Sequence, residues 1–143
     1  MIPRVLVAWL VCAGPVAAWE FTPGLPCLLH HKGATAEIEL TYDPRLPRYS
    51  VTIRRDAPWP DAPIFAMRFD GPESLTISTD RHSLGQDGWS VTVVDRGFGN
   101  VLNGLQFNET VTAGLGGQTV TFSLDDAAGP VAAFRACRAL PGV

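Results

Sequence analysis

The sequence predicts a mainly β protein: an antiparallel β-sandwich or barrel of about seven strands, with a short C-terminal helix and one disulfide. Three observations lead to this fold class. Apolar and polar residues alternate with a period of two in several short segments after residue 34, as in half-buried strands. Two turns rich in glycine or proline join such segments in matching register, which is typical of β-hairpins. Two cysteines lie near opposite ends of the predicted mature chain, where they suit a structural disulfide.

The first predicted hairpin consists of residues 35–42 and 49–54. Apolar side chains occupy every second position in both segments, and the connection over residues 43–48 contains an aspartate and two prolines, which favour a turn. A slip by one residue would set apolar side chains against polar ones, so the pattern selects one register. That register pairs Tyr42 with Tyr49, Leu40 with Val51, Ile38 with Ile53 and Glu37 with Arg54.

Five further strands follow the same alternation. Three cover residues 64–69, 74–79 and 89–93. The other two form a hairpin around the two-residue turn Gly116-Gly117, a sequence that favours the turns of tight hairpins. In this hairpin the expected pairs are Val111 with Phe122, Thr112 with Thr121 and Ala113 with Val120.

Other segments depart from the strand pattern. Residues 19–34 are interrupted by proline and glycine and are expected to be an irregular lead-in. Residues 100–106 predict a short helical turn. Pro130 suits the first residue of a C-terminal helix. The apolar face of that helix is formed by Ala133, Phe134, Cys137 and Leu140.

Residues 1–18 have the features of a secretory signal peptide. Arg4 supplies a positive charge, residues 5–13 are an uninterrupted apolar run, and residues 16–18 are small, the order that signal peptidase recognises. The apolar run is less than half of the roughly 20 residues that a spanning helix needs. A buried N-terminal helix is the other interpretation, but it does not explain these flanks. We therefore expect cleavage before Trp19, a periplasmic or secreted bacterial protein, and one domain over residues 19–143.

Charge and composition argue against nucleic acid as a partner. The formal net charge is −3, and the basic residues form no stripe of the kind that nucleic-acid binders carry. No amphipathic basic helix indicates a membrane surface protein, and no transmembrane segment is expected in the mature chain. All basic residues except Lys32 are arginine, a bias that suggests a GC-rich bacterial genome.

Cys27 and Cys137 are the two cysteines of the predicted mature chain. In an oxidising compartment such a pair most simply forms one structural disulfide. A redox-active pair usually has close spacing, such as C-x-x-C. Closing a loop of this length would stabilise the fold by about 4 to 5 kcal/mol in the chain-entropy model.

The sequence assigns no catalytic, cofactor-binding or metal-binding residue. Residues 80–83 supply the residue types of a hydrolytic triad, but adjacent residues seldom converge and no G-x-S-x-G motif is present. His30 and His31 are adjacent, so they would point to opposite faces of a strand instead of sharing a zinc ion. Residues 95–100 lack the full G-x-G-x-x-G pattern, and no phosphate-binding loop is present.

Two groups remain as candidate sites. The first is a polar cluster at the predicted strand ends, formed by Asp80, Arg81, His82, Asp95 and Arg96. Its ion pairs are either structural or part of a site that holds an anionic ligand through arginine.

The second candidate is Trp59, which lies between two prolines. It either anchors a partner or covers the end of the sandwich core.

Four segments also carry a resemblance to a known family. FAMRFDG (65–71), ISTDRH (77–82), DRGFGNVL (95–102) and VAAFRAC (131–137) together resemble a family of small exported proteobacterial proteins of unknown function. Members are often labelled as a component of the DNA-repair excinuclease ABC. That component is a large cytosolic ATP-driven DNA-binding protein, so the label conflicts with an export signal and with the missing phosphate-binding loop. The chain is more distantly similar to invasion-associated locus B proteins, which are exported, β-rich and disulfide-bonded.

These features predict a non-catalytic exported domain that binds another envelope protein or a small ligand. Exposed sheet edges or the loop around Trp59 would form the contact surface. The alternative is a small periplasmic hydrolase that uses Asp80, His82 and Asp95. It requires these three side chains to meet within hydrogen-bond distance in a cleft.

Overall fold

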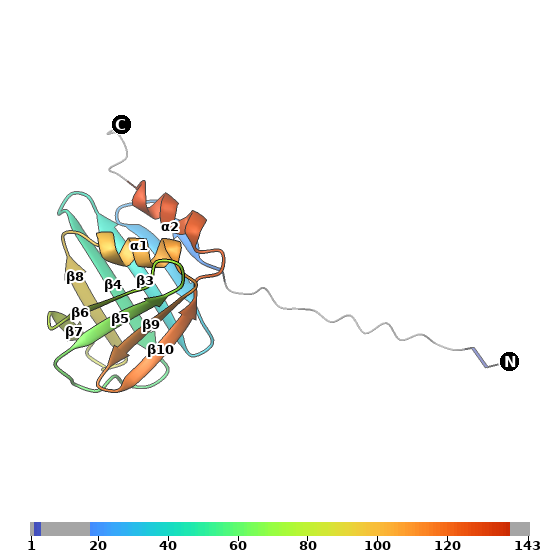
Figure 1. Cartoon of the computed structure of the whole chain (residues 1–143), viewed down its shortest axis with the longest axis horizontal. Coiled ribbons are helices and arrows are strands. Elements are labelled where there is room, and N and C mark those ends of the chain that lie inside the picture. Colours follow the sequence, from blue (N-terminus) through green and yellow to red (C-terminus); the bar gives the residue numbers. More distant parts are fainter. Residues whose placement is uncertain (1, 4–17, 138–143) are drawn as a thin grey trace.

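Two antiparallel sheets face each other (Figure 1). Most of the buried apolar side chains belong to one core cluster to which both sheets contribute. A computed structural model describes residues 2, 3 and 18–137. These residues form ten strands and two helices, and they confirm a mainly β antiparallel fold with a short helix near the C-terminus. Of the predicted signal peptide, residues 1 and 4–17 lie outside the described residues.

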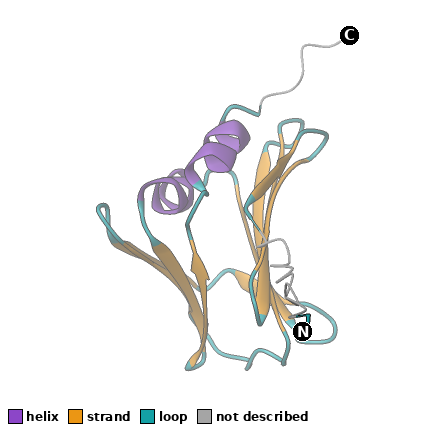
Figure 2. Cartoon of the chain, turned by 90° about the vertical axis from the view of Figure 1, so that its right-hand side faces the viewer, coloured by secondary structure: helices purple, strands orange, loops and turns teal. Residues whose placement is uncertain are grey.

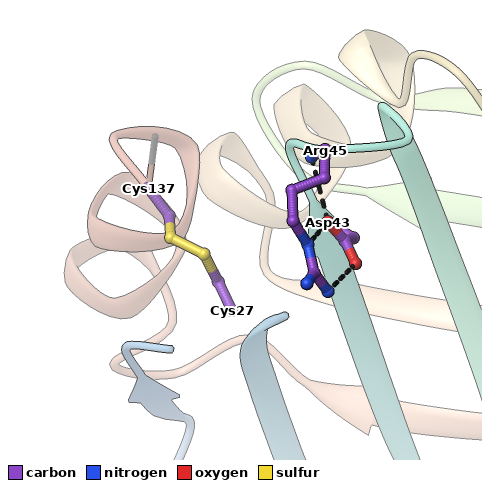
Figure 3. The surroundings of a disulfide bond; sticks show 4 residues. All are labelled: Cys27, Asp43, Arg45 and Cys137. Carbon is purple, nitrogen blue, oxygen red and sulfur yellow. Dashed lines mark hydrogen bonds and ion pairs between the residues drawn. A yellow bond between two sulfur atoms is a disulfide. The ribbon is translucent and has the colours of Figure 1, made fainter. Parts of the chain in front are cut away.

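The larger sheet has six strands in the order β1-β2-β3-β4-β8-β7. The hairpin predicted for residues 35–54 is β3–β4, and every expected pair is observed in the expected register. The turn between them is fixed by Asp43, whose carboxylate accepts hydrogen bonds of 2.8–3.0 Å from the backbone and guanidinium of Arg45 (Figure 3). The bounds are β1 (Glu20–Thr22), β2 (Cys27–Lys32), β3 (Ala36–Asp43), β4 (Arg48–Arg55), β7 (His82–Leu84) and β8 (Ser90–Asp95).

The smaller sheet has four strands in the order β10-β9-β5-β6. The predicted pairing of β9 with β10 is confirmed at all three expected positions. Gly116 and Gly117 have φ values of 58° and 80°, and positive φ at both central residues is what a tight type I′ turn requires. The bounds are β5 (Phe65–Asp70), β6 (Leu75–Thr79), β9 (Thr110–Leu115) and β10 (Gln118–Ser123).

The core fills the space between the sheets with the inward side chains of alternating strand positions. In β3 and β4 the inward residues are the apolar ones of the predicted pattern. Those in the middle of the strands (Ile38, Leu40, Val51 and Ile53) are at most 2% exposed, whereas Ala36, Tyr42 and Tyr49 near the strand ends are partly buried. The largest fully buried side chains are Phe69, Phe122, Phe134, Leu29, Ile38, Leu40, Ile53, Met67, Leu105 and Leu115.

Helices α1 (Gly99–Phe107) and α2 (Ala128–Arg135) lie at one end of the two sheets (Figure 2). Helix α1 matches the helical turn predicted for residues 100–106. Helix α2 begins two residues before Pro130, which therefore lies in its first turn, and it ends at Arg135. Cys137 consequently follows the helix instead of extending its apolar face, and Leu140 lies outside the described residues.

A disulfide between Cys27 and Cys137 ties the segment after α2 to the first residue of β2 (Figure 3). The two residues are separated by 110 positions, and their Cα atoms are 6.5 Å apart. This pairing confirms the prediction from the cysteine positions. Because Cys27 is fully buried, the bond fixes α2 to the core and not to a surface loop.

Two predictions about local structure are wrong. Residues 19–34 are not an irregular lead-in, because they contain β1 and β2, and in β2 the side chains of Cys27, Leu29 and His31 alternate inward. Cysteine and histidine occupy two of these three core positions and obscure the apolar pattern. His82 belongs to β7, which pairs with β8, although residues 80–83 were expected to form only a polar turn. With these three extra strands the sandwich has ten.

Candidate functional site

A cavity of about 530 Å³ that is open to solvent on one side lies between the two sheets. Strands of both sheets contribute to it, together with the connection from β6 to β7 and the first turn of α1. This size falls in the range of roughly 300–1,000 Å³ that small-molecule pockets occupy. The lining residues are Val51, Phe65, Met67, Ile77, Ser78, Thr79, Arg81, Val93, Asp95, Gly97, Phe98, Gly99, Asn100 and Val101.

The inner part of this cavity is apolar. Val51, Phe65 and Met67 are at most 3% exposed, and Phe98 and Val101 are at most 6% exposed. They point inward because they occupy core-facing positions of β4, β5 and the start of α1. A ligand that enters would therefore exchange water for apolar side chains, which is favourable by about 25 cal/mol per Å² of apolar surface.

The charged side chains of the lining are Arg81 and Asp95. Arg81 follows β6 and Asp95 ends β8, and Nη2 of Arg81 donates a hydrogen bond of 3.2 Å to Oδ2 of Asp95. The side chain of Arg81 is 71% exposed and that of Asp95 is 40% exposed, so they lie at the mouth. A pair this exposed contributes little to stability, and breaking it for a ligand would cost little.

The structure divides the predicted polar cluster. Arg81 and Asp95 meet at the cavity, whereas Asp80 and Arg96 are exposed. His82 turns away from them, and its Nε2 lies 2.9 Å from the carbonyl oxygen of Ala62. Within residues 18–137, no hydrogen bond joins Asp80, His82 and Asp95 to one another. The arrangement that the hydrolase alternative requires is not formed.

Trp59 is not a surface contact. Its side chain is 3% exposed, its Nε1 donates a hydrogen bond of 3.1 Å to the carbonyl oxygen of Ile53, and the guanidinium of Arg55 lies 4.6 Å from the ring centre. The hypothesis that Trp59 anchors a partner is therefore wrong. The ring covers one end of the core, as the second interpretation held.

The sequence does not reveal the segment from Gly97 to Val101 as a site, because its glycines match only part of a phosphate-binding motif. In the structure, Phe98 turns into the core, while Gly97 and Gly99 expose backbone to the cavity. Among residues 18–137 no side chain caps the start of α1, and its first turn contains no acidic residue. The glycines on both sides of a buried aromatic residue were the available signal.

A second hollow, of about 640 Å³, lies beside the start of the described chain. Ala18, His31, Lys32, Asp125 and Asp126 are among its lining residues. Residues 4–17 lie directly before this region and are outside the described part, so the hollow is not treated as a site.

Neither a metal site nor a membrane span is found in the part of the chain that the structure describes. There, no three histidine, cysteine or acidic side chains are placed to hold a metal ion. No helix among these residues has the length and apolar character needed to cross a membrane.

No protein-family model, curated protein or solved structure matches this chain.

Proposed function

We propose that the chain is an exported, non-catalytic binding domain that takes one small, mainly apolar ligand into the cavity between its sheets. The observation that carries this proposal is a cavity of about 530 Å³ whose inner wall consists of buried apolar side chains from both sheets. Pockets of this size with a few polar groups at one side are typical small-molecule sites. Export is proposed from residues 1–18, and the buried disulfide is consistent with an oxidising compartment.

The cavity favours a small ligand over an envelope protein as the partner. Burial of Trp59 removes the aromatic anchor that a protein interface would have used. The lining residues also support binding without turnover, because they include no histidine to serve as a general base and no cysteine to serve as a nucleophile.

The proposal can be tested by filling the cavity. Protein produced from the full-length sequence is titrated with the neutral fluorescent probe N-phenyl-1-naphthylamine, which brightens in apolar sites. In Val93→Trp the indole should occupy the cavity, because Val93 lines it. We expect the probe affinity to fall about tenfold or more as apolar burial is lost.

The next residue of the same strand supplies the control. Val94 is 44% exposed and does not line the cavity, so Val94→Trp should bind the probe like the wild type. Equal binding by both variants would contradict the proposal. Ile77→Phe, at a second lining position, replaces Val93→Trp if that variant does not reach the wild-type circular dichroism spectrum.

A further inference from the structure

We propose that the ligand is an amphipathic carboxylate, with its anionic head group bound by Arg81 at the mouth and its apolar body inside the cavity. This inference rests on the proposed function. The cavity defines the site. The charge of the head group follows from the hydrogen-bond donors and acceptors of the lining side chains that have no partner within the described part of the protein.

Arg81 and Asp95 differ in how many of their hydrogen-bonding positions remain unused. Both oxygens of Asp95 already accept hydrogen bonds, Oδ2 from Arg81 and Oδ1 from the backbone N–H of Arg96 at 2.7 Å. A guanidinium has five N–H donors, and among the described residues that of Arg81 uses one of them. An ionised carboxylate has about four acceptor positions, and Asp95 uses two of them. The pair therefore keeps more unused donors than unused acceptors, which suits an anion better than a cation.

A carboxylate matches these donors in geometry as well as in charge. Its two oxygens can accept two parallel hydrogen bonds from one guanidinium. Because the side chain of Arg81 is 71% exposed, it can turn toward a ligand without leaving a buried position. Asp95 would keep its backbone partner when Arg81 changes partners.

The start of α1 adds to the positive potential on the same cavity. The first backbone N–H groups of a helix have no acceptor within the helix, and those of Gly99, Asn100 and Val101 belong to residues that line the cavity. In the described part of the chain, no side chain caps these N–H groups. The helix dipole makes this end favourable for negative charge.

Two glycines leave this backbone open to a ligand. A Cβ atom added at Gly97 or Gly99 would meet no atom within 4 Å, and neither residue has a left-handed φ. Packing and backbone conformation thus do not require glycine at either position. Glycine has no side chain, so it allows a ligand to approach the backbone closely.

Three probes with the same ten-carbon body and different head groups test the inference: decanoate, decanol and decylammonium. Each is titrated against the fluorescent probe on protein produced from the full-length sequence. We expect decanoate to bind about tenfold more tightly than decanol, the scale of a charge-assisted hydrogen bond at an exposed site. Decylammonium should bind more weakly than either.

Substitution of the arginine identifies the group responsible. In Arg81→Gln, decanoate should lose its advantage while decanol binds as before. Arg96→Gln is the matched control, because Arg96 is a neighbouring exposed arginine outside the cavity lining, and its backbone N–H remains. This variant should retain the preference for decanoate.

The outcomes separate the inference from the proposed function. Equal affinity for decanoate and decanol, or a preference that survives Arg81→Gln, would overturn the anionic head group and leave the binding cavity intact. If decylammonium bound most tightly and this preference disappeared in Asp95→Asn, the head group of the ligand would be a cation and the inference would be wrong. Failure of all three compounds to displace the probe, with no effect of Val93→Trp, would overturn the proposed function itself.

Discussion

His31 places a titratable ring at the edge of the core. The side chain is 8% exposed, its ring stacks on Trp19 with centroids 4.7 Å apart and planes 7° apart, and Phe122 meets it edge-on. Trp19 is held in turn by a hydrogen bond of 2.9 Å from its Nε1 to the carbonyl oxygen of Ser123. Burial of the imidazole lowers its pKa from 6.5, and the neighbouring His30 lowers it further, whereas a hydrogen bond with the backbone of Ala18 opposes the shift.

This lowered pKa makes the stability of the fold depend on pH. Near pH 6 the unfolded chain binds more protons at His31 than the folded chain does, so the free energy of unfolding falls as pH falls. The contribution of His31 is fully present above pH 6.5 and is lost as pH decreases through the lower folded pKa. Urea unfolding between pH 8 and pH 5 should show this decrease.

The variant His31→Phe tests the assignment. It keeps an aromatic ring against Trp19 and removes the titrating group, so its stability should decrease less between pH 8 and pH 5 than that of the wild type. Parallel profiles for the two proteins would show that His31 does not cause the effect.

At the scale of elements, α1 is held against the smaller sheet by two close contacts. Gly104 faces Phe69, and an added Cβ would lie 2.5 Å from the ring atom Cγ. Asn108, which follows the helix, hydrogen-bonds both backbone groups of Glu73 and the carbonyl oxygen of Gly104 at 2.9–3.0 Å. These contacts fix the helix whose first turn lines the cavity.

Gly104→Ala should therefore destabilise the protein. Overpacking of a buried site costs about 1–3 kcal/mol, and alanine recovers up to about 1 kcal/mol through its higher helix propensity. We expect a net loss of about 1 kcal/mol in urea unfolding. Gly99→Ala, in the same helix but with open space around it, should be as stable as the wild type. Equal stability of both variants would contradict the close contact with Phe69.

The hairpins β3–β4 and β9–β10 were predicted from the sequence down to the paired residues. The alternation of apolar residues determines their register locally, because a slip by one residue would move all the apolar side chains of a strand to the solvent-exposed face of the sheet. Strand β2 was missed because its inward positions include Cys27 and His31. Their burial depends on partners far along the chain, namely Cys137 and Phe122.

For the whole molecule, the disulfide joins the two ends of the described domain. Loss of a bond that closes a loop this long typically costs about 2–5 kcal/mol. Cys137→Ala is the suitable variant, because Cys137 is partly exposed while Cys27 is fully buried. Its urea midpoint should fall below that of the oxidised wild type and should not respond to dithiothreitol. A midpoint equal to that of the oxidised wild type would show that the bond contributes nothing.

The cavity is also a property of the whole molecule. Its lining comes from four strands, from Arg81 in a connection and from the segment that begins α1. Arg81 and Asp95 were predicted to lie at strand ends, where an anion site was one interpretation, but the apolar wall behind them was not predicted. Val51, Phe65 and Phe98 are ordinary core residues in the sequence, and only the spacing of the two packed sheets leaves a cavity beside them.

The sequence by itself predicted the strand alternation, two hairpin registers and the disulfide partners, because each follows from local periodicity or from the two cysteines that follow the predicted signal peptide. Tertiary structure alone decided that Trp59 is buried, that His82 turns away from Asp95, and that a cavity remains between the sheets. These features depend on how side chains distant in sequence fill a shared volume. Local patterns show which face of a strand is apolar, but they do not show where two apolar faces fail to meet.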